Sequence, residues 1–188
     1  MDSKNHLMKD IPHIWARKML TILFAYDIDK DGIVSYEDCM RVADRIIRSA
    51  NLKDPAASNV IQCFRDFHSG MDQILPNYWI KSCTEQVLDC WSAVKSPKFK
   101  EALEKFHVKR FQILDFDSDG FISFSEFLHY WKALNLDQSL ARLQFDYMDT
   151  NKDGKISENE YVDAALDYEL NYTDKDTRNR SFGPLVDF

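Results

Sequence analysis

Three twelve-residue segments of the chain carry oxygen-bearing side chains at the same relative positions. They read DIDKDGIVSYED, DFDSDGFISFSE and DTNKDGKISENE, and they begin at Asp27, Asp115 and Asp149. Each has Asp at position 1, Asp or Asn at position 3, Asp at position 5, Gly at position 6, Val or Ile at position 8, Ser at position 9 and a carboxylate at position 12. Such a segment can curl around one hard divalent cation, which prefers about six to eight oxygen ligands. The repeat therefore predicts three metal-binding loops.

The spacing is that of the EF-hand calcium loop, in which alternate side chains point at the ion and position 7 contributes its backbone carbonyl. Gly at position 6 permits the sharp turn, and Ser at position 9 is expected to reach the ion through water. We call the three segments loop one, loop three and loop four. Their predicted ligands are Asp27, Asp29, Asp31, Ile33 and Asp38 in loop one, Asp115, Asp117, Asp119, Phe121 and Glu126 in loop three, and Asp149, Asn151, Asp153, Lys155 and Glu160 in loop four.

Loop one differs from the other two at position 12, where Asp38 stands in place of Glu. Because Asp is one methylene shorter, a bidentate grasp requires the backbone to come closer, whereas a monodentate, near-octahedral site favours Mg²⁺. We therefore expect loop one to be a mixed Ca²⁺/Mg²⁺ site. Glu37 is the alternative donor, but at position 11 its side chain should point away from the ion.

A fourth hand is expected between residues 55 and 95, because EF-hands pair through the short extended stretch at position 8. Within these residues, two apolar helical patterns flank the expected loop, the second beginning near Tyr78. Placing Leu75 at position 8 makes the fourth loop, loop two, run from His68 to Trp79. Asp72 is then its one credible side-chain oxygen. Loop two is therefore predicted to bind no calcium and to serve as the structural partner of loop one.

The remaining periodicity is nearly all helical, with few Gly and Pro to interrupt it. We predict an all-α fold in which eight helices form four EF-hands in two pairs, with short β pairing between loops, in one compact globular body. The N-terminal pair covers residues 1–94 and the C-terminal pair covers residues 98–172. The connector Lys95-Ser96-Pro97 is too short, and its proline too disruptive, for a long helix between the pairs. Residues 173–188 form an extension that we expect to pack on the body.

Composition and motifs argue against several classes of function. The 31 acidic and 24 basic residues give a net charge of −7, which offers no basic face to a nucleic acid. No apolar run of about 18 residues indicates a membrane span, and no signal-peptide pattern is found, so we expect a cytoplasmic protein. No HExxH motif, nucleophile elbow or glycine-rich phosphate loop is present, so no enzymatic activity is expected. The 4 cysteines follow no metal spacing and are predicted to be reduced thiols.

With loops one, three and four competent and loop two degenerate, the sequence resembles the invertebrate sarcoplasmic calcium-binding proteins over nearly its whole length. Asp38 at the end of loop one and the ending Phe182-Gly183-Pro184-Leu185 are most similar to that family. The related luciferin-binding proteins and calcium-activated photoproteins share the same arrangement of competent loops. The resemblance implies a compact cytosolic buffer of Ca²⁺, with Mg²⁺ in competition, that requires no protein partner.

Two other functions stay open at this point. One is a calcium-gated carrier of a hydrophobic small molecule such as a coelenterazine-type luciferin, because the 13 Phe, 8 Tyr and 4 Trp could line a cavity. Packing of the EF-hand pairs is the simpler explanation of these rings. The other is a calcium sensor, although the 6 methionines are scattered along the chain and do not suggest a target-binding groove. The resemblance argues against a photoprotein, because the C-terminal stretch has Tyr168 and Tyr172 but no His or Trp.

Overall fold

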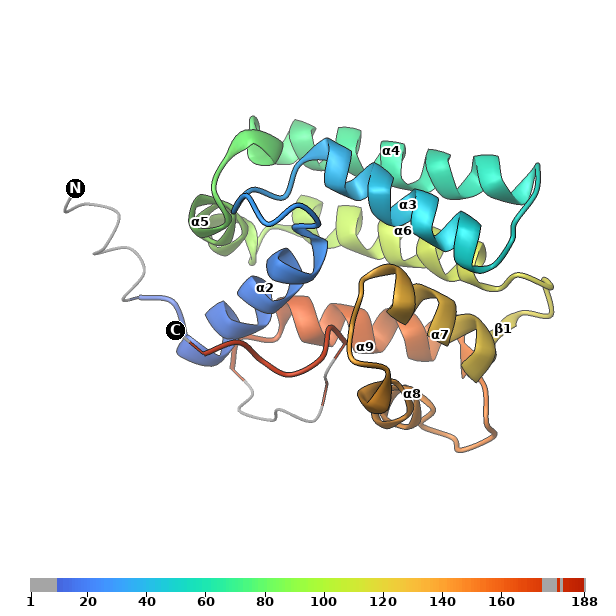
Figure 1. Cartoon of the computed structure of the whole chain (residues 1–188). Helices are drawn as coiled ribbons and strands as arrows, with labels where there is room; N and C mark the ends of the chain where they lie inside the picture. Colours follow the sequence, from blue (N-terminus) through green and yellow to red (C-terminus); the bar gives the residue numbers. More distant parts are fainter. Residues whose placement is uncertain (1–9, 174–178, 180, 188) are drawn as a thin grey trace.

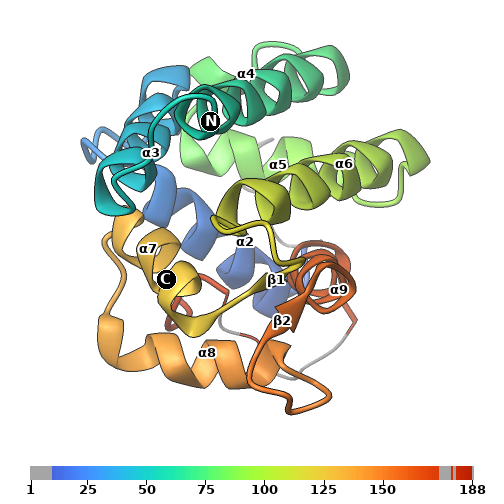
Figure 2. The same ribbon diagram turned by 90° about the vertical axis from the view of Figure 1, so that its right-hand side faces the viewer.

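The structure, a computed structural model, describes residues 10–173, 179 and 181–187. In this part of the chain eight α-helices follow one another (Figures 1 and 2). They are α2 His13–Tyr26, α3 Tyr36–Ser49, α4 Ala56–Ile74, α5 Cys83–Ala93, α6 Pro97–Leu114, α7 Phe124–Ala133, α8 Ala141–Met148 and α9 Glu158–Leu170. The 3₁₀ turns η1 Tyr78–Ile80 and η2 Gln138–Leu140 and the strands β1 Phe121–Ile122 and β2 Ile156–Ser157 complete the set. The predicted helical fold with short β pairing is confirmed. None of the helices described is long and apolar enough to cross a bilayer.

Four of the helices begin with the same local device, a capping box. A serine at the N-cap accepts a hydrogen bond from the backbone N–H three residues later, and the acidic side chain at that position accepts one from the serine N–H. The pairs are Ser35 with Asp38 in α3, Ser82 with Glu85 in α5, Ser123 with Glu126 in α7, and Ser157 with Glu160 in α9. In α3, α7 and α9 these residues are positions 9 and 12 of a predicted metal loop. The end of each loop is therefore also the start of a helix.

Loops three and four pair with each other as predicted. Strands β1 and β2 are antiparallel, with Phe121 opposite Ser157 and Ile122 opposite Ile156. The two isoleucines are position 8 of their loops, and both are fully buried. This two-residue ladder fixes loops three and four side by side.

Loop one has a different partner, and the expected pairing with Leu75 is wrong. The side chain of Gln86, from the first turns of α5, takes the place of a strand. Its Nε2 donates to the Val34 carbonyl at 2.9 Å, and the Val34 N–H donates to its Oε1 at 3.4 Å. One main-chain bond, from the Cys83 N–H to the Gly32 carbonyl at 2.9 Å, supports this contact. A primary amide has the same donor and acceptor as a peptide group, so one side chain can substitute for a ladder partner.

Most of predicted loop two is helical. Helix α4 continues to Ile74, so residues 68–74 are not a loop, and only the residues between Ile74 and Cys83 connect α4 to α5. The helix predicted to begin near Tyr78 starts at Cys83, after η1. The helical period continues because nothing in residues 68–74 draws the chain around an ion. Trp79 then folds back onto the helix, stacking on His68 with ring centroids 4.9 Å apart and donating its Nε1–H to the His68 carbonyl at 3.1 Å.

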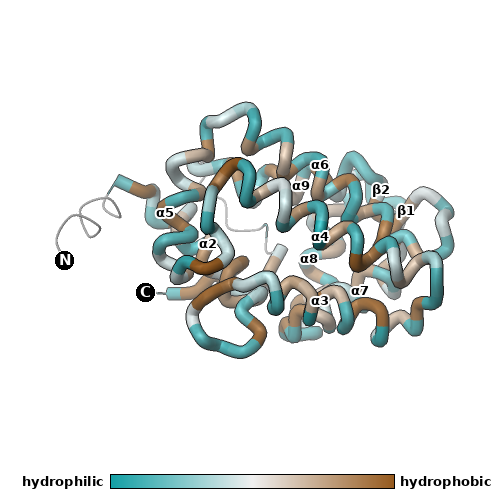
Figure 3. Tube along the Cα trace, turned by 90° about the horizontal axis from the view of Figure 1, so that it is seen from above, coloured by the Kyte–Doolittle hydropathy of each residue, from teal (hydrophilic) through white to brown (hydrophobic). Residues whose placement is uncertain are grey.

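The helices of the two predicted pairs pack on one another around a shared core. Helix α4 lies along α6 and α3 contacts α7, while α6 packs on α9 and α2 on α5 (Figures 1 and 2). Hydrophobic residues recur at intervals along the helices, between hydrophilic ones (Figure 3). Trp15 and Trp131 are fully buried. The packing gives the compact globular body that we predicted.

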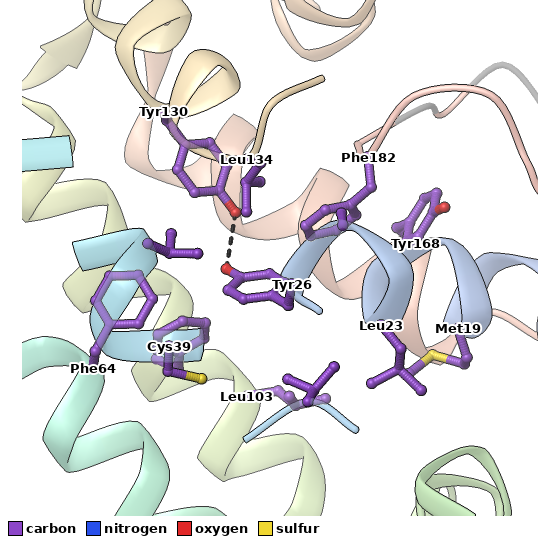
Figure 4. Close-up of a cluster of buried hydrophobic side chains, with 14 of the residues drawn as sticks. Met19, Leu23, Tyr26, Cys39, Phe64, Leu103, Tyr130, Leu134, Tyr168 and Phe182 are labelled. Carbon is purple, nitrogen blue, oxygen red and sulfur yellow. Dashed lines mark hydrogen bonds between the residues drawn. The ribbon is translucent and has the colours of Figure 1, made fainter. Parts of the chain in front are cut away.

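The end of the chain returns to α2 and α9. The ring of Phe182 is buried, with its centroid 5.6 Å from that of Tyr168 and 6.1 Å from that of Tyr26 (Figure 4). Arg17 of α2 donates its Nε–H to the Val186 carbonyl at 2.7 Å. These contacts hold the described part of the tail against the body. Residues 174–178, 180 and 188 of the predicted extension lie outside the described residues.

Candidate metal centres

The three predicted loops share one backbone course. Position 4 has a positive φ in each, at 63° for Lys30, 58° for Ser118 and 60° for Lys152. The glycine at position 6 follows with φ between 84° and 86°. These two left-handed residues turn the chain back on itself, and glycine adopts that conformation without the steric cost of a Cβ atom.

The aspartate at position 1 closes each turn with both of its carboxylate oxygens. In loop one Asp27 accepts the N–H of Asp31 at 3.2 Å and that of Gly32 at 3.0 Å. Asp115 and Asp149 accept the same two N–H groups in loops three and four, at distances from 2.9 to 3.1 Å. The position 5 carboxylate then accepts the N–H of position 7, that is, of Ile33, Phe121 and Lys155 at 2.9 to 3.0 Å. The predicted ligands at positions 1, 5 and 7 therefore lie in one hydrogen-bonded frame.

In loops one and three the carboxylates converge as a divalent ion requires. One oxygen from each of Asp27, Asp29 and Asp38 lies within 4.8 Å of the other two. The same holds for Asp115, Asp117 and Glu126. Two oxygens bound to one Ca²⁺ can be at most about 5 Å apart, twice the usual Ca–O distance. Both donor sets are hard oxygens, so the residues present fit Ca²⁺ or Mg²⁺.

Loop four has the same frame with one charge fewer, because Asn151 occupies position 3. Its amide donates to Asp153 Oδ2 at 3.0 Å. Glu160 accepts hydrogen bonds from the N–H groups of Thr150 and Ser157, both at 2.9 Å. Burial opposes ionisation of Glu160, but the bonds from Ser157, Thr150 and Asn151 outweigh it and lower its pKa to about 2. The predicted terminal ligand of loop four is therefore ionised, as metal binding requires.

Asp38 reaches the same kinds of donor as the longer Glu126. Asp38 Oδ1 accepts the N–H of Ile28 at 3.1 Å, and Glu126 Oε1 accepts the equivalent N–H of Phe116 at 2.7 Å. The carboxylate of Asp38 is completely buried, whereas Glu126 is slightly exposed. The shorter side chain thus accepts the same backbone N–H as the longer one, at a longer distance.

Two cationic side chains contact the predicted ligands, and the sequence motif indicates neither. Arg41 of α3 forms ion pairs with Asp29 and Asp38. Lys155 of loop four forms one with Asp119 of loop three, at 2.8 Å. The hydrogen bond from Arg41 lowers the pKa of Asp29, and the one from Lys155 lowers the pKa of Asp119. The three-residue spacing of Arg41 from Asp38 is visible in the sequence, whereas the contact across loops by Lys155 is not.

A cavity of about 60 Å³ lies at the centre of the molecule. Its lining is mostly apolar and comes from α2, α3, α4, η1, α5, α6, α9 and the tail, with Met19, Leu23, Leu103 and Phe182 among the residues (Figure 4). Arg110 and Glu169 add one basic and one acidic group.

The polar groups of this region are buried and bonded to one another. Arg110 Nη1 donates to the Tyr130 hydroxyl at 3.1 Å, and that hydroxyl lies 3.1 Å from the Tyr26 hydroxyl. His107 Nε2 is 2.9 Å from Glu169 Oε2. Burial lowers the pKa of His107 despite the neighbouring Glu169, which keeps the imidazole neutral near pH 7. The interior therefore combines an apolar lining with a small polar network.

Known proteins share both the sequence pattern and the fold. Residues 104–166 match the family model of the EF-hand domain pair. The sarcoplasmic calcium-binding protein of Hediste diversicolor is 32% identical over 181 residues, which cover 92% of this chain and 99% of that protein. The luciferin-binding protein of Renilla reniformis is 27% identical over 175 residues, covering 90% of this chain and 94% of that protein. The crystal structure of the calcium-loaded apo form of the coelenterazine-binding protein of Renilla muelleri has the same fold, with a TM-score of 0.71 at 24% identity over 91% of this chain and 96% of that one.

Proposed function

The chain belongs to the sarcoplasmic calcium-binding proteins of the EF-hand superfamily, and from this premise we propose that it is a cytoplasmic calcium buffer with three ion sites at which Mg²⁺ competes. The observation that carries the proposal is the common frame of loops one, three and four. In each loop an Asp at position 1 closes the turn, and in loops one and three the position 12 carboxylate converges with those at positions 1 and 3. No catalytic role is proposed for any residue.

The charge of the chain supports ion uptake as a stabilising event. Three divalent ions add six positive charges to a net charge of −7, which leaves −1. Carboxylates that repel one another in the metal-free loops are then neutralised. At a hundredfold excess of ion over its dissociation constant, each site adds about 2.7 kcal/mol to the free energy of unfolding if the unfolded chain does not bind the ion.

We favour buffering over sensing because the 6 methionines are scattered along the chain and the exposed large apolar residues among those described are few. In the described part of the chain the exposed large hydrophobic residues are Phe24, Ile80 and Leu143, each in a different element. A sensor of the calmodulin type presents a continuous methionine-rich groove to its target. Calcium should therefore cause little increase in the binding of an apolar dye.

The test is a calorimetric calcium titration of the metal-stripped protein, with and without millimolar Mg²⁺. We expect three sites whose apparent affinity falls when Mg²⁺ is present. Glu126→Gln and Glu160→Gln should each remove one site, because each deletes the terminal carboxylate of its loop. Glu158→Gln is the matched control, since it removes the same charge from loop four at a position that is not a ligand. An unchanged number of sites in either ligand variant would contradict the assignment of that loop.

The central cavity favours a second candidate, a calcium-gated carrier of a hydrophobic small molecule. The luciferin-binding relative supports this candidate as well. A volume of about 60 Å³ is much smaller than the roughly 300–1,000 Å³ of pockets that hold drug-sized ligands. Such cargo would therefore have to displace part of the lining, and Phe182 is the lining residue that the described part of the tail contributes.

Tryptophan fluorescence distinguishes the carrier from the buffer. Trp79 lines the cavity, so a coelenterazine-type ligand that enters it should quench the emission of the metal-free protein. Calcium should then restore the emission by releasing the ligand. Absence of quenching at micromolar ligand would exclude the carrier function and leave the buffer function intact.

A further inference from the structure

Arg41 places a guanidinium group between two predicted ligands of loop one. It belongs to the second turn of α3, three residues after Asp38. Its Nη1 lies 2.6 Å from Asp29 Oδ2 and 3.2 Å from Asp38 Oδ1. These carboxylates, with that of Asp27, form the converging donor set of the loop. The arginine thus occupies part of the coordination shell that a divalent ion would need.

The equivalent positions of the other two loops carry no such cation. His129 follows Glu126 by three residues; its ring packs edge-on against Phe116 of loop three, and its Nδ1 lies 2.8 Å from the Ser49 hydroxyl on α3 rather than at a carboxylate. Asp163 follows Glu160 by three residues and is acidic and exposed. Among the three loops, an arginine in contact with positions 3 and 12 is therefore particular to loop one.

We infer that Arg41 is a tethered competitor of the divalent ion, which makes the affinity of loop one lower than its own ligands would give. The inference rests on the proposed ion binding of that loop. A guanidinium is charged at every physiological pH, so its single positive charge offsets one of the two negative charges whenever the ion is absent. Both Asp29 Oδ2 and Asp38 Oδ1 must give up this contact before they can bind an ion.

The competitor can withdraw, so loop one is weakened but not blocked. The Arg41 side chain is 46% exposed, and Asp29 is 42% exposed. An exposed arginine can swing into water at modest cost, because water solvates both partners of an exposed ion pair. The contact with Asp38 is the less exposed of the two, since the Asp38 side chain is only 1% exposed.

The experiment compares Arg41→Met with the parent protein in full-length chains that also carry Glu126→Gln and Glu160→Gln, so that loop one is the site observed. Calcium affinity is measured by calorimetry at low ionic strength. We expect Arg41→Met to raise the affinity about threefold to tenfold. The melting temperature of the metal-free protein should fall by about 1–4 °C, because the buried Asp38 then lacks its counter-ion.

If Arg41 competes with the ion, Arg41→Met raises the calcium affinity and lowers the melting temperature. If Arg41 has a purely structural role, both the calcium affinity and the melting temperature fall. Arg48→Met is the matched control, since Arg48 is on the same helix and pairs with Asp44 rather than with a ligand. It removes the same charge and should leave the affinity within about twofold. Arg41→Lys keeps the charge but replaces the delocalised guanidinium with a compact, strongly hydrated ammonium, so its affinity should lie between those of the parent and Arg41→Met.

Two results would overturn the inference, and they can be told apart. Equal affinity in the parent and Arg41→Met would show that the arginine does not compete, while loop one stays an ion site. Absence of calcium from loop one in both proteins would contradict the proposed third site and the inference together.

Discussion

At the scale of single residues, the carboxylate at position 12 has two roles that depend on each other. It is a predicted ligand, and it also accepts the N–H of the serine that caps the following helix. Asp38 does this for α3 with Oδ2, at 3.0 Å from the Ser35 N–H. Glu126 does the same for α7 at 2.8 Å. An ion bound at position 12 must therefore share this carboxylate with the helix cap.

Lengthening Asp38 tests whether position 12 sets the choice of ion. Asp38→Glu should raise the preference of loop one for Ca²⁺ over Mg²⁺, because the longer side chain can offer both oxygens without moving α3. We expect a change of about tenfold, equivalent to ~1.4 kcal/mol. The measurement is the effect of Mg²⁺ on a calcium titration, with Glu37→Asp at position 11 as the control. If Mg²⁺ competes equally well in Asp38→Glu, another feature of loop one sets its selectivity.

Residue spacing predicts local geometry well and distant contacts poorly. The predicted ligands of each loop lie within twelve residues, so the motif alone indicates that they surround one point. Lys155 makes a contact that residue spacing does not predict. The motif assigns it only a backbone carbonyl, whereas its Nζ lies 2.8 Å from Asp119, 36 residues away in the other loop. That contact depends on the β1–β2 ladder, which positions the two loops.

At the scale of elements, the first pair of hands is joined by a side chain in place of a strand. Gln86 is fully buried, and its amide bonds both Val34 and the Tyr78 carbonyl, the latter at 3.0 Å. The contact links loop one, η1 and α5. It could not be predicted from sequence, because an isolated glutamine at a helical position is usually exposed.

Truncating Gln86 should destabilise the first pair. Gln86→Ala leaves the N–H and carbonyl of Val34 buried without their partner, which costs about 1–3 kcal/mol in the free energy of unfolding. Urea unfolding of the metal-free protein measures the loss. Gln62→Ala is the control, since Gln62 is exposed on α4 and should change stability by less than about 0.5 kcal/mol. Equal losses in the two variants would show that the Gln86 bridge contributes nothing specific.

The error in loop two has an element-scale cause as well. Sequence patterns indicate where a helix can continue but give weak signals for where it stops when no strong breaker is present. Residues 68–74 contain no proline, and α4 ends two residues before Pro76. The helix therefore uses residues 68–74 that the repeat pattern assigned to a degenerate loop.

At the scale of the whole molecule, the described part of the tail packs against both α2 and α9 and contributes to the core. Phe182 is 3% exposed and lines the central cavity next to Tyr26 and Tyr168. The motif FGPL suggested a family but not this position, since the path of the tail depends on tertiary packing. The contact explains why a segment after the last helix contributes to the interior.

Removing the Phe182 ring should destabilise the body and enlarge its cavity. Phe182→Ala is expected to lower the free energy of unfolding by about 3–5 kcal/mol, the usual cost of deleting a buried aromatic ring. Urea unfolding of the metal-free protein is the measurement. Phe24→Ala removes a ring that is 45% exposed and should cost less than about 1 kcal/mol. A small loss in Phe182→Ala would mean that the tail does not pack on the body in solution.

Ion binding at one loop is transmitted to the neighbouring loop differently in the two EF-hand pairs. Between loops three and four runs a main-chain ladder, which is stiff, so the shape taken by one occupied loop favours the same shape in the other. We therefore expect loops three and four to bind calcium cooperatively, with a Hill coefficient above one. Loop one meets its neighbour mainly through the rotatable side chain of Gln86, and that neighbour holds no predicted site. It should fill independently, so one protein would combine a steep response to calcium with a graded one.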